Sequence, residues 1–461
     1  MPSVAVERLP VEMLGLGLLG FDHLQIVFQT DGRPNSQDDW FVIEGLRDID
    51  GRQIRLAVEG WDGGTTLSDA NGGRTGDALT AKIGTRNSRG AREIADGAAA
   101  IELWATLASH AADIETQRFP YIALALPGSP LPTINSSSLV ASLLHHAGIG
   151  IAAALPSRLR FSPGMTTLLG TSRDDTLAAS NGFSTLLGGR GRDTLRGSNN
   201  ADKLYGGADD DTFHWTRGSD VVHGGQPDLD YADDGFDVID FTGAGHVHLE
   251  AAPEEEAHRR PDFIATYAGG QDLLFSIEEI SWDGHGDRVS IGKGVGLTAP
   301  QPPRLVFGEG RDSTDGANVV DLAQVETGFD IVLGDIDDRR LRPAALRSRL
   351  SVTGADVIVG SPHADRFIVM PRASPFILED ASPDDRIVLS QRPARIEADF
   401  DPQRPRDLVV CAFAENDDIT TIRVRDFQDG DLGLSPSGLG GFDYLDDIPI
   451  EISFSDAAGA G

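Results

Sequence analysis

The chain has 461 residues, which is long enough for two to four domains. Its 72 acidic residues outnumber its 39 basic ones and give a formal net charge of −33, which argues against a nucleic-acid partner because phosphate binding needs a basic surface. No apolar run approaches about eighteen residues, so no membrane-spanning helix is predicted. The single cysteine, Cys411, excludes an intramolecular disulfide.

The first part of the chain, residues 1–155, predicts an α+β domain. Alternating apolar and polar residues at 23–28 and 40–44 are typical of strands. The Ala-rich segment 91–114 predicts a long helix, and residues 137–147 predict a second one.

A repeat of nine residues begins at Gly170 and continues without a gap through six copies to His223. The residues at position six are Asp175, Ser184, Asp193, Asp202, Asp211 and Asp220. Those at position eight are Leu177, Leu186, Leu195, Leu204, Phe213 and Val222. Only the copy at 188–196, GGRGRDTLR, matches the pattern GGxGxDxUx at every defined position, but the register holds throughout.

Beyond residue 224 the repeats become scattered fragments. A second pair in register, at 351–368, places Asp356 and Asp365 at position six, and residues 384–390 resemble a last degenerate turn. The C-terminal half therefore predicts a β-rich solenoid that is interrupted by loops.

The nonapeptide pattern predicts calcium sites. Each repeat is expected to form a six-residue turn and a three-residue strand, with glycines at positions one, two and four where a side chain would be forbidden. Backbone carbonyls and the position-six carboxylates of stacked turns then form oxygen cages suited to Ca²⁺. The predicted metal residues are Asp175, Gly188, Gly189, Gly191, Asp193, Asp202, Gly206, Gly207, Asp211, Asp220, Asp356 and Asp365.

Two such repeats are expected to make one coil of a flattened spiral, so that the stacked repeats form a parallel β-roll with a thin apolar core. We expect this segment to be unfolded without metal, because the core is too thin to hold it together and its carboxylates repel one another. Thr171, Ser184 and Ser198 depart from the pattern, so sites that use their turns are expected to be weak or empty.

These repeats resemble the RTX (repeats-in-toxin) family. The resemblance implies a secreted, extracellular protein that leaves the cell through a type I exporter by means of an uncleaved C-terminal signal. The tail 446–461 fits such a signal, and the short apolar stretch 13–19 lacks the basic region of a cleaved N-terminal signal peptide.

The N-terminal domain contains neither HExxH nor GxSxG, which excludes the corresponding metalloprotease and lipase motifs. The strand FDHLQIVF followed much later by INSSSLVASLL resembles the circularly permuted papain-like hydrolases, relatives of lecithin retinol acyltransferase. The resemblance implies Ser136 as nucleophile, His23 as general base and Glu44 as the residue that orients the imidazole. Serine stands where those relatives have cysteine, and a hydroxyl is harder to ionise than a thiol.

Plain structural roles explain the same residues: helix capping for the serines, and a buried strand position for His23. Three classes of function therefore stay open. The chain is a secreted toxin-like effector with an acyl or amide hydrolase, a non-catalytic adhesin or surface-layer protein, or a calcium-dependent binding module. The predicted domains are 1–155, the roll at 156–230, a degenerate solenoid at 231–400, and a C-terminal cap with the export signal at 401–461.

Overall fold

A computed structural model of the chain forms two compact units, which are described separately. The first contains residues 1–213 and 223–235, and the second contains residues 214–222 and 236–461. The structure describes residues 1–10, 22–29, 40–50, 53–59, 90–122, 124–125, 132–157, 162–179, 184–225, 235–252, 261–284, 286–295, 303–308, 316–334, 349–370, 373–389, 393, 395–413, 419–429, 431–434, 441–444, 450–451 and 453–454.

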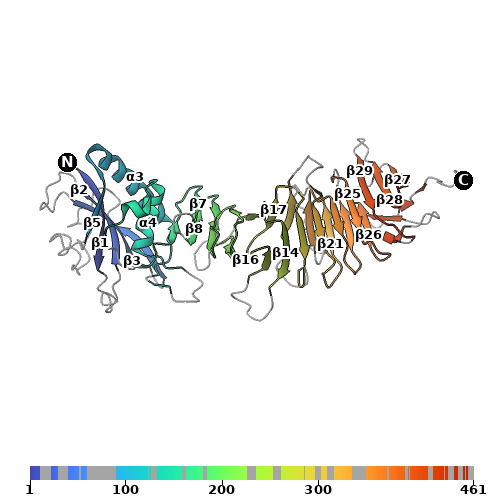
Figure 1. Cartoon of the computed structure of the whole chain (residues 1–461), viewed down its shortest axis with the longest axis horizontal. Coiled ribbons are helices and arrows are strands. Elements are labelled where there is room, and N and C mark those ends of the chain that lie inside the picture. The colour runs from blue at the N-terminus through green and yellow to red at the C-terminus, as the bar shows by residue number, and fades with distance from the viewer. Residues whose placement is uncertain are drawn as a thin grey trace. The chain divides into compact units, whose positions relative to one another are not determined.

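The first unit begins with a sheet in the order β4-β3-β2-β1-β5 (Figure 1). Its strands are β1 (Ser3–Pro10), β2 (Asp22–Gln29), β3 (Trp40–Asp50), β4 (Gln53–Glu59) and β5 (Ala91–Asp96). All neighbouring strands are antiparallel, as in the pairs Val6↔Ile26 and Ile26↔Ile43. Because side chains alternate between the faces of a strand, Val6, Ile26 and Ile43 share one face.

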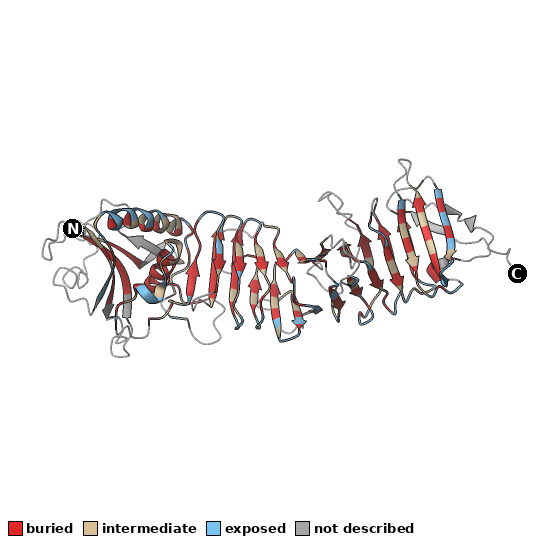
Figure 2. Ribbon diagram, turned by 45° about the horizontal axis from the view of Figure 1, so that its top comes forward, coloured by how far each residue is buried: buried red, intermediate tan, exposed pale blue. Residues whose placement is uncertain are grey.

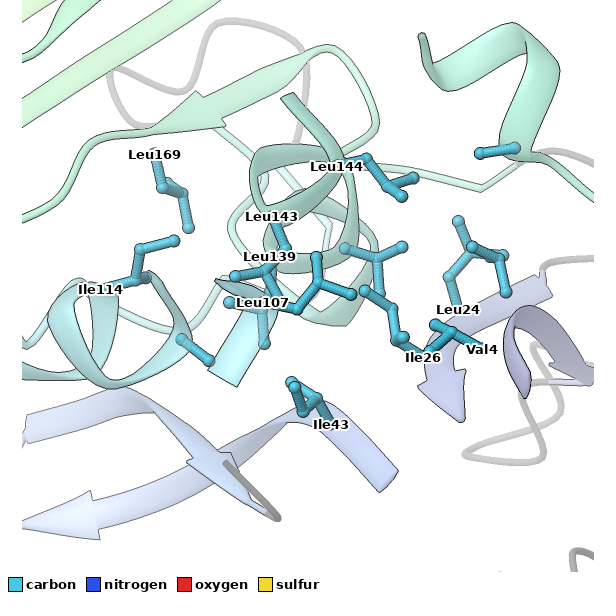
Figure 3. Packing of buried hydrophobic residues seen from close by; sticks show 14 of the residues in the cluster. Val4, Leu24, Ile26, Ile43, Leu107, Ile114, Leu139, Leu143, Leu144 and Leu169 are labelled. Carbon is cyan, nitrogen blue, oxygen red and sulfur yellow. The ribbon is translucent and has the colours of Figure 1, made fainter. Parts of the chain in front are cut away.

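Two helices cover that face: α3 (Gly97–Thr116) and α4 (Ser136–His146), followed by the short α5 (Ile151–Ala154). Leu107 of α3 and Leu143 of α4 pack with the sheet residues in one buried cluster (Figure 3). The α+β prediction is confirmed. The expected helix at 91–114 is wrong in its first six residues, because 91–96 pair with β1 as β5 and the helix begins only at Gly97.

The nonapeptides follow as the strands β6 (Thr167–Leu169), β7 (Thr176–Ala178), β8 (Thr185–Arg190), β9 (Thr194–Arg196), β10 (Lys203–Ala208) and β11 (Thr212–His214). β6, β8 and β10 pair in parallel with a shift of two repeats, so that Leu168, Leu186 and Leu204 stack. On the opposite sheet Leu177 stacks on Leu195. The position-eight side chains are buried, and the strands in this region are coloured mainly as buried or intermediate (Figure 2). Together with the parallel pairing, this confirms the predicted parallel β-roll.

The roll and the N-terminal domain share one hydrophobic core within the first unit. Leu169, Leu187 and Tyr205 belong to the same buried cluster as the helices and the first sheet. The side chain of Leu169 lies close to Ile114 of α3 (Figure 3). The first coils of the roll are therefore supported from one end by a conventional core.

The second unit is a solenoid of parallel strands, as the scattered repeat fragments predict. One sheet has the order β12-β16-β15-β14-β18-β20-β23-β25-β29-β28-β27-β32, and the other has the order β13-β17-β19-β22-β21-β24-β26-β30-β31. Val289, Val320, Ile358 and Leu378 stack in consecutive coils and are all buried. The antiparallel strands β14 to β16 form an inserted meander, and β27 to β29 form a second one at the far end of this sheet.

The strands of this unit have the following bounds: β12 (Val221–His223), β13 (Val238–Asp240), β14 (His246–Ala251), β15 (Phe263–Tyr267), β16 (Gly270–Phe275), β17 (Glu279–Trp282), β18 (Arg288–Ile291), β19 (Arg304–Phe307), β20 (Val319–Asp321), β21 (Asp330–Leu333), β22 (Arg349–Thr353), β23 (Val357–Val359), β24 (Arg366–Val369), β25 (Phe376–Glu379), β26 (Arg386–Leu389), β27 (Arg395–Asp401), β28 (Arg404–Phe413), β29 (Ile419–Val424), β30 (Gly441–Tyr444), β31 (Ile450–Glu451) and β32 (Ser453–Phe454).

Candidate calcium sites

The turn at 188–193 shows why this repeat needs its glycines. Gly189 and Gly191 have φ of 107° and 104°, a region that side-chain-bearing residues rarely adopt. A Cβ on Gly189 would also lie 2.8 Å from Gln117 Oε1. Glycine is thus required both by the backbone conformation and by the close approach of Gln117, which follows α3.

Three successive backbone N–H groups of this turn donate to side chains outside it. Arg190 N–H donates to Gln117 Oε1 (2.9 Å), Gly191 N–H to Asp209 Oδ2 (3.2 Å) and Arg192 N–H to Asp174 Oδ1 (2.9 Å). In a trans peptide the preceding C=O points opposite to the N–H. The carbonyls of residues 189, 190 and 191 therefore point away from these acceptors, and the Gly189 carbonyl faces the next coil, where a Cβ on Gly207 would lie within 3.0 Å of its oxygen.

Beside Gly188, a carboxylate oxygen of the same turn lies close to a carbonyl oxygen of the next coil. A Cβ on Gly188 would stand within 3.0 Å of both Asp193 Oδ2 and Gly206 O. The same arrangement recurs one coil later, where Asp211 Oδ2 and Gly224 O flank Gly206. The position-one glycines therefore leave the space in which these oxygens converge.

The carboxylate of Asp193 is buried and only partly hydrogen-bonded. Its side chain is 1% exposed, and Oδ1 accepts the N–H of Asp175 at 2.8 Å, whereas Oδ2 has no hydrogen-bond partner among the described residues. Without a cation, burial, assisted by the nearby carboxylates Asp175, Asp174 and Asp209, raises the pKa of Asp193 to about 8 against the lowering effect of the Asp175 N–H. A divalent cation would stabilise the ionised form and satisfy Oδ2.

The ligand chemistry fits Ca²⁺. Within the described ranges no three His, Cys, Asp or Glu side chains form a metal cluster, so a cation in the roll would take most of its ligands from the backbone. Carbonyl and carboxylate oxygens are the donors that Ca²⁺ prefers. Asp193 and Asp211 would hold it together with carbonyls of the adjoining coils, such as Gly206 O and Gly224 O. The ion would supply the positive charge that keeps the buried Asp193 carboxylate ionised.

The other predicted metal aspartates are held differently. Asp175, Asp202 and Asp365 each accept the N–H of the position-two residue of their own turn, at 2.6, 2.5 and 2.7 Å. Asp220 accepts the Thr216 hydroxyl at 3.2 Å, and Asp356 accepts the N–H of Asn318 at 2.8 Å.

The three residues of the hydrolase hypothesis lie at the first sheet and the start of α4. Asn135 caps α4 by accepting Ser137 N–H at 2.8 Å, and the hydroxyl of Ser136 donates to the carbonyl of Leu24, the residue after His23 in β2. Ser136 is 1% exposed. Glu44 is buried on the sheet face opposite to Ile43 and hence to α4, so the structure does not bring it to Ser136. The side chain of His23 lies outside the described residues.

Sequence reasoning missed Gln117 and Tyr267. Gln117 follows an Ala-rich helix and is fully buried, but nothing local indicates that it contacts a turn more than seventy residues later. Tyr267 lies in the solenoid and its hydroxyl is 2.6 Å from Asp272 Oδ1 and 3.1 Å from Gly218 O. The contacts that the Gln117 amide and the Tyr267 hydroxyl make with segments distant in the sequence can be identified only in the folded chain.

No helix in the described part of the chain combines the length and apolarity that crossing a membrane would require. No curated protein matches the chain. A family model described as RTX calcium-binding nonapeptide repeat (4 copies) matches residues 169–202 and, overlapping with it, residues 187–222. Residues 169–222 are therefore RTX calcium-binding nonapeptide repeats, and the chain carries a calcium-binding parallel β-roll.

Proposed function

We propose that the chain is a secreted protein whose β-roll becomes ordered when it binds extracellular calcium. The observation that carries this proposal is the pair of oxygens beside Gly188, where the buried Asp193 Oδ2 faces a carbonyl of the next coil. Cytosolic calcium is scarce and extracellular calcium is abundant, so such a site stays unloaded until export. Binding then contributes directly to the folding free energy of the roll.

Calcium titration of the full chain tests this proposal. In chelator, amide hydrogens at 188–193 and 206–211 should exchange rapidly, and millimolar calcium should protect them. Asp193→Asn should weaken binding at least tenfold, because it removes the buried negative charge, whereas Asp401→Asn, in strand β27 of the second unit, should not. A wild-type chain that binds no calcium, or protection that is complete in chelator, would refute the proposal.

Export through a type I system is the finer part of this proposal. It is supported by the RTX repeats, whose carriers are generally secreted. Deleting residues 401–461 should retain the protein inside the cell, and deleting residues 1–19 should not. Secretion that survives the C-terminal deletion would contradict this route while leaving calcium binding untouched.

An N-terminal acyl or amide hydrolase, as in a toxin-like effector, is a second candidate function. The supporting observation is the contact between Ser136 and the Leu24 carbonyl, which brings the start of α4 to the strand that contains His23. Since Ser136 is buried, substrate entry requires the start of this helix to become uncovered.

The experiment is hydrolysis of an activated ester by the full chain. Ser136→Ala and His23→Ala should each abolish it, and Ser136→Cys should raise it. Ser142→Ala is the matched control, because Ser142 is also a buried α4 serine and its hydroxyl bonds two backbone groups, Ser138 O and Leu169 N. Activity that survives both alanine variants would favour the non-catalytic alternative, in which the domain is a structural or binding part of an extracellular protein.

A further inference from the structure

Two groups of six-residue turns, among those that the structure describes, close in different ways. The glycine turns, 188–193 and 206–211, have positive φ at positions two and four, at Gly189 and Gly191 in the first turn and Gly207 and Asp209 in the second. In the described part of the chain, three other turns have Thr or Ser at position two and no positive φ at position two or four. We call these the hydroxyl turns; they are 170–175, 197–202 and 360–365.

In each hydroxyl turn the position-two side chain caps the position-six aspartate. Thr171 Oγ1 donates to Asp175 Oδ2 at 2.9 Å, and Ser198 Oγ donates to Asp202 Oδ2 at 2.8 Å. In the third turn Ser361 Oγ lies 2.9 Å from Asp365 Oδ1. Together with the N–H of the same residue, the hydroxyl supplies two donors to one carboxylate.

The same hydroxyl also accepts the N–H of the residue at position four. The distances are 3.3 Å from Arg173, 3.1 Å from Asn200 and 3.1 Å from His363. This N–H therefore points into the turn, whereas the corresponding Gly191 N–H of the glycine turn points out to Asp209. A cation inside a hydroxyl turn would face the positive end of an N–H dipole and would have to break two hydrogen bonds to the carboxylate.

A hydroxyl also lies among the turn oxygens at 215–220. Tyr267 Oη is 3.1 Å from the Gly218 carbonyl, 3.5 Å from the Thr216 carbonyl and 2.6 Å from Asp272 Oδ1, while Thr216 Oγ1 caps Asp220. Asp272 Oδ1 in turn accepts the N–H of Asp220 at 2.9 Å. Two turn carbonyls and a carboxylate thus converge on a tyrosine hydroxyl, the same kinds of oxygen that converge beside Gly188.

We propose that side-chain hydroxyls replace the cation in these turns, so that calcium is confined to the glycine turns and the hydroxyl turns close without metal. The inference rests on the proposed calcium-binding function and specifies its sites. Asp193 and Asp211 are cation ligands, whereas Asp175, Asp202 and Asp365 are turn-closing residues. The solenoid turn 360–365 is accordingly closed in calcium-free solution.

The test compares the same substitution at position six in the two kinds of turn. Asp193→Asn and Asp202→Asn are made in the full chain, and bound calcium per chain is measured by equilibrium dialysis against radioactive calcium. Asp193→Asn should lose at least one ion. Asp202→Asn should keep the wild-type number and lower the melting temperature equally in calcium and in chelator. Ser198→Ala, a milder change in the same turn, should also keep the wild-type number.

Hydrogen exchange of the wild-type chain gives a second measurement. Amides at 360–365 should be equally protected in chelator and in calcium, because Ser361 and not a cation closes that turn. Loss of calcium by Asp202→Asn or Ser198→Ala to the same extent as by Asp193→Asn, or protection at 360–365 that requires calcium, would overturn the inference and leave calcium binding intact. A wild-type chain that binds no calcium would instead overturn the proposed function itself.

Discussion

Replacing Gly207 by alanine tests the geometry of the glycine turns most directly. Gly207 has φ of 130°, and a Cβ on it would lie within 3.0 Å of the carbonyl group of Gly189 in the preceding coil. The obstacle is backbone and not the end of a flexible side chain, so the two coils must move apart. Their separation disturbs the same carbonyls and carboxylates that would hold calcium.

The structure sets the size of the effect. A sparsely populated φ costs about 1–3 kcal/mol, and overpacking of a close contact costs about 1–3 kcal/mol. Gly207→Ala should therefore destabilise the stacked, calcium-loaded roll by about 2–6 kcal/mol. Since about 1.4 kcal/mol corresponds to a factor of ten, calcium affinity should fall by about thirtyfold or more.

Gly148→Ala is the matched control. Gly148, just after α4, also has a positive φ of 71°, but a Cβ there would meet nothing within 4 Å. This variant should lose only about 1–2 kcal/mol of backbone stability and bind calcium normally. Calorimetric titration and thermal unfolding in calcium and in chelator separate the two effects. Wild-type calcium affinity in Gly207→Ala would refute the stacked-coil geometry.

Three further predictions concern single groups. Because burial raises the pKa of Asp193 to about 8 in the folded, metal-free turn while the unfolded chain releases this proton near 3.8, ordering of the turn without calcium should become less favourable as pH rises between those values; hydrogen-exchange protection factors of the amides at 188–193, measured in chelator at several pH values, check the sign. Tyr267→Phe should cost about 1–3 kcal/mol in urea unfolding, equally with and without calcium, because the oxygens of Gly218 and Asp272 lose their hydroxyl partner. Gln117→Ala should weaken calcium binding severalfold in titration, because the Arg190 N–H loses the acceptor that turns it outward; unchanged affinity would show that this contact does not shape the turn.

The repeating part of the fold could be predicted from sequence because its contacts are separated by a fixed number of residues. A period of nine residues with an apolar position eight is sufficient to stack Leu177 on Leu195 and Leu186 on Leu204. The helix at 136–146 was also predictable, because Asn135 and the serines after it supply a capping box before an apolar run.

The start of α3 was not predictable in the same way. Residues 91–96 have local helix propensity, but Ala91 and Glu93 pair with Glu7 and Ala5 of the first strand. A sheet partner that is distant in the sequence outweighs weak local preference, and no local pattern records its presence. The Gln117 contact with the roll escaped prediction for the same reason.

The order of the turns along the chain explains what the departures from the repeat pattern do. Thr171 and Ser198 looked like defects of calcium sites in the sequence, but each lies four residues before the aspartate that it caps. The first turn of the roll, next to the core of the N-terminal domain, is thus a hydroxyl turn, and so is 360–365 in the solenoid. In the first unit the glycine turns 188–193 and 206–211 alternate along the chain with the hydroxyl turns 170–175 and 197–202. In the proposed scheme calcium acts on the glycine turns of this unit, and the neighbouring hydroxyl turns close without the ion.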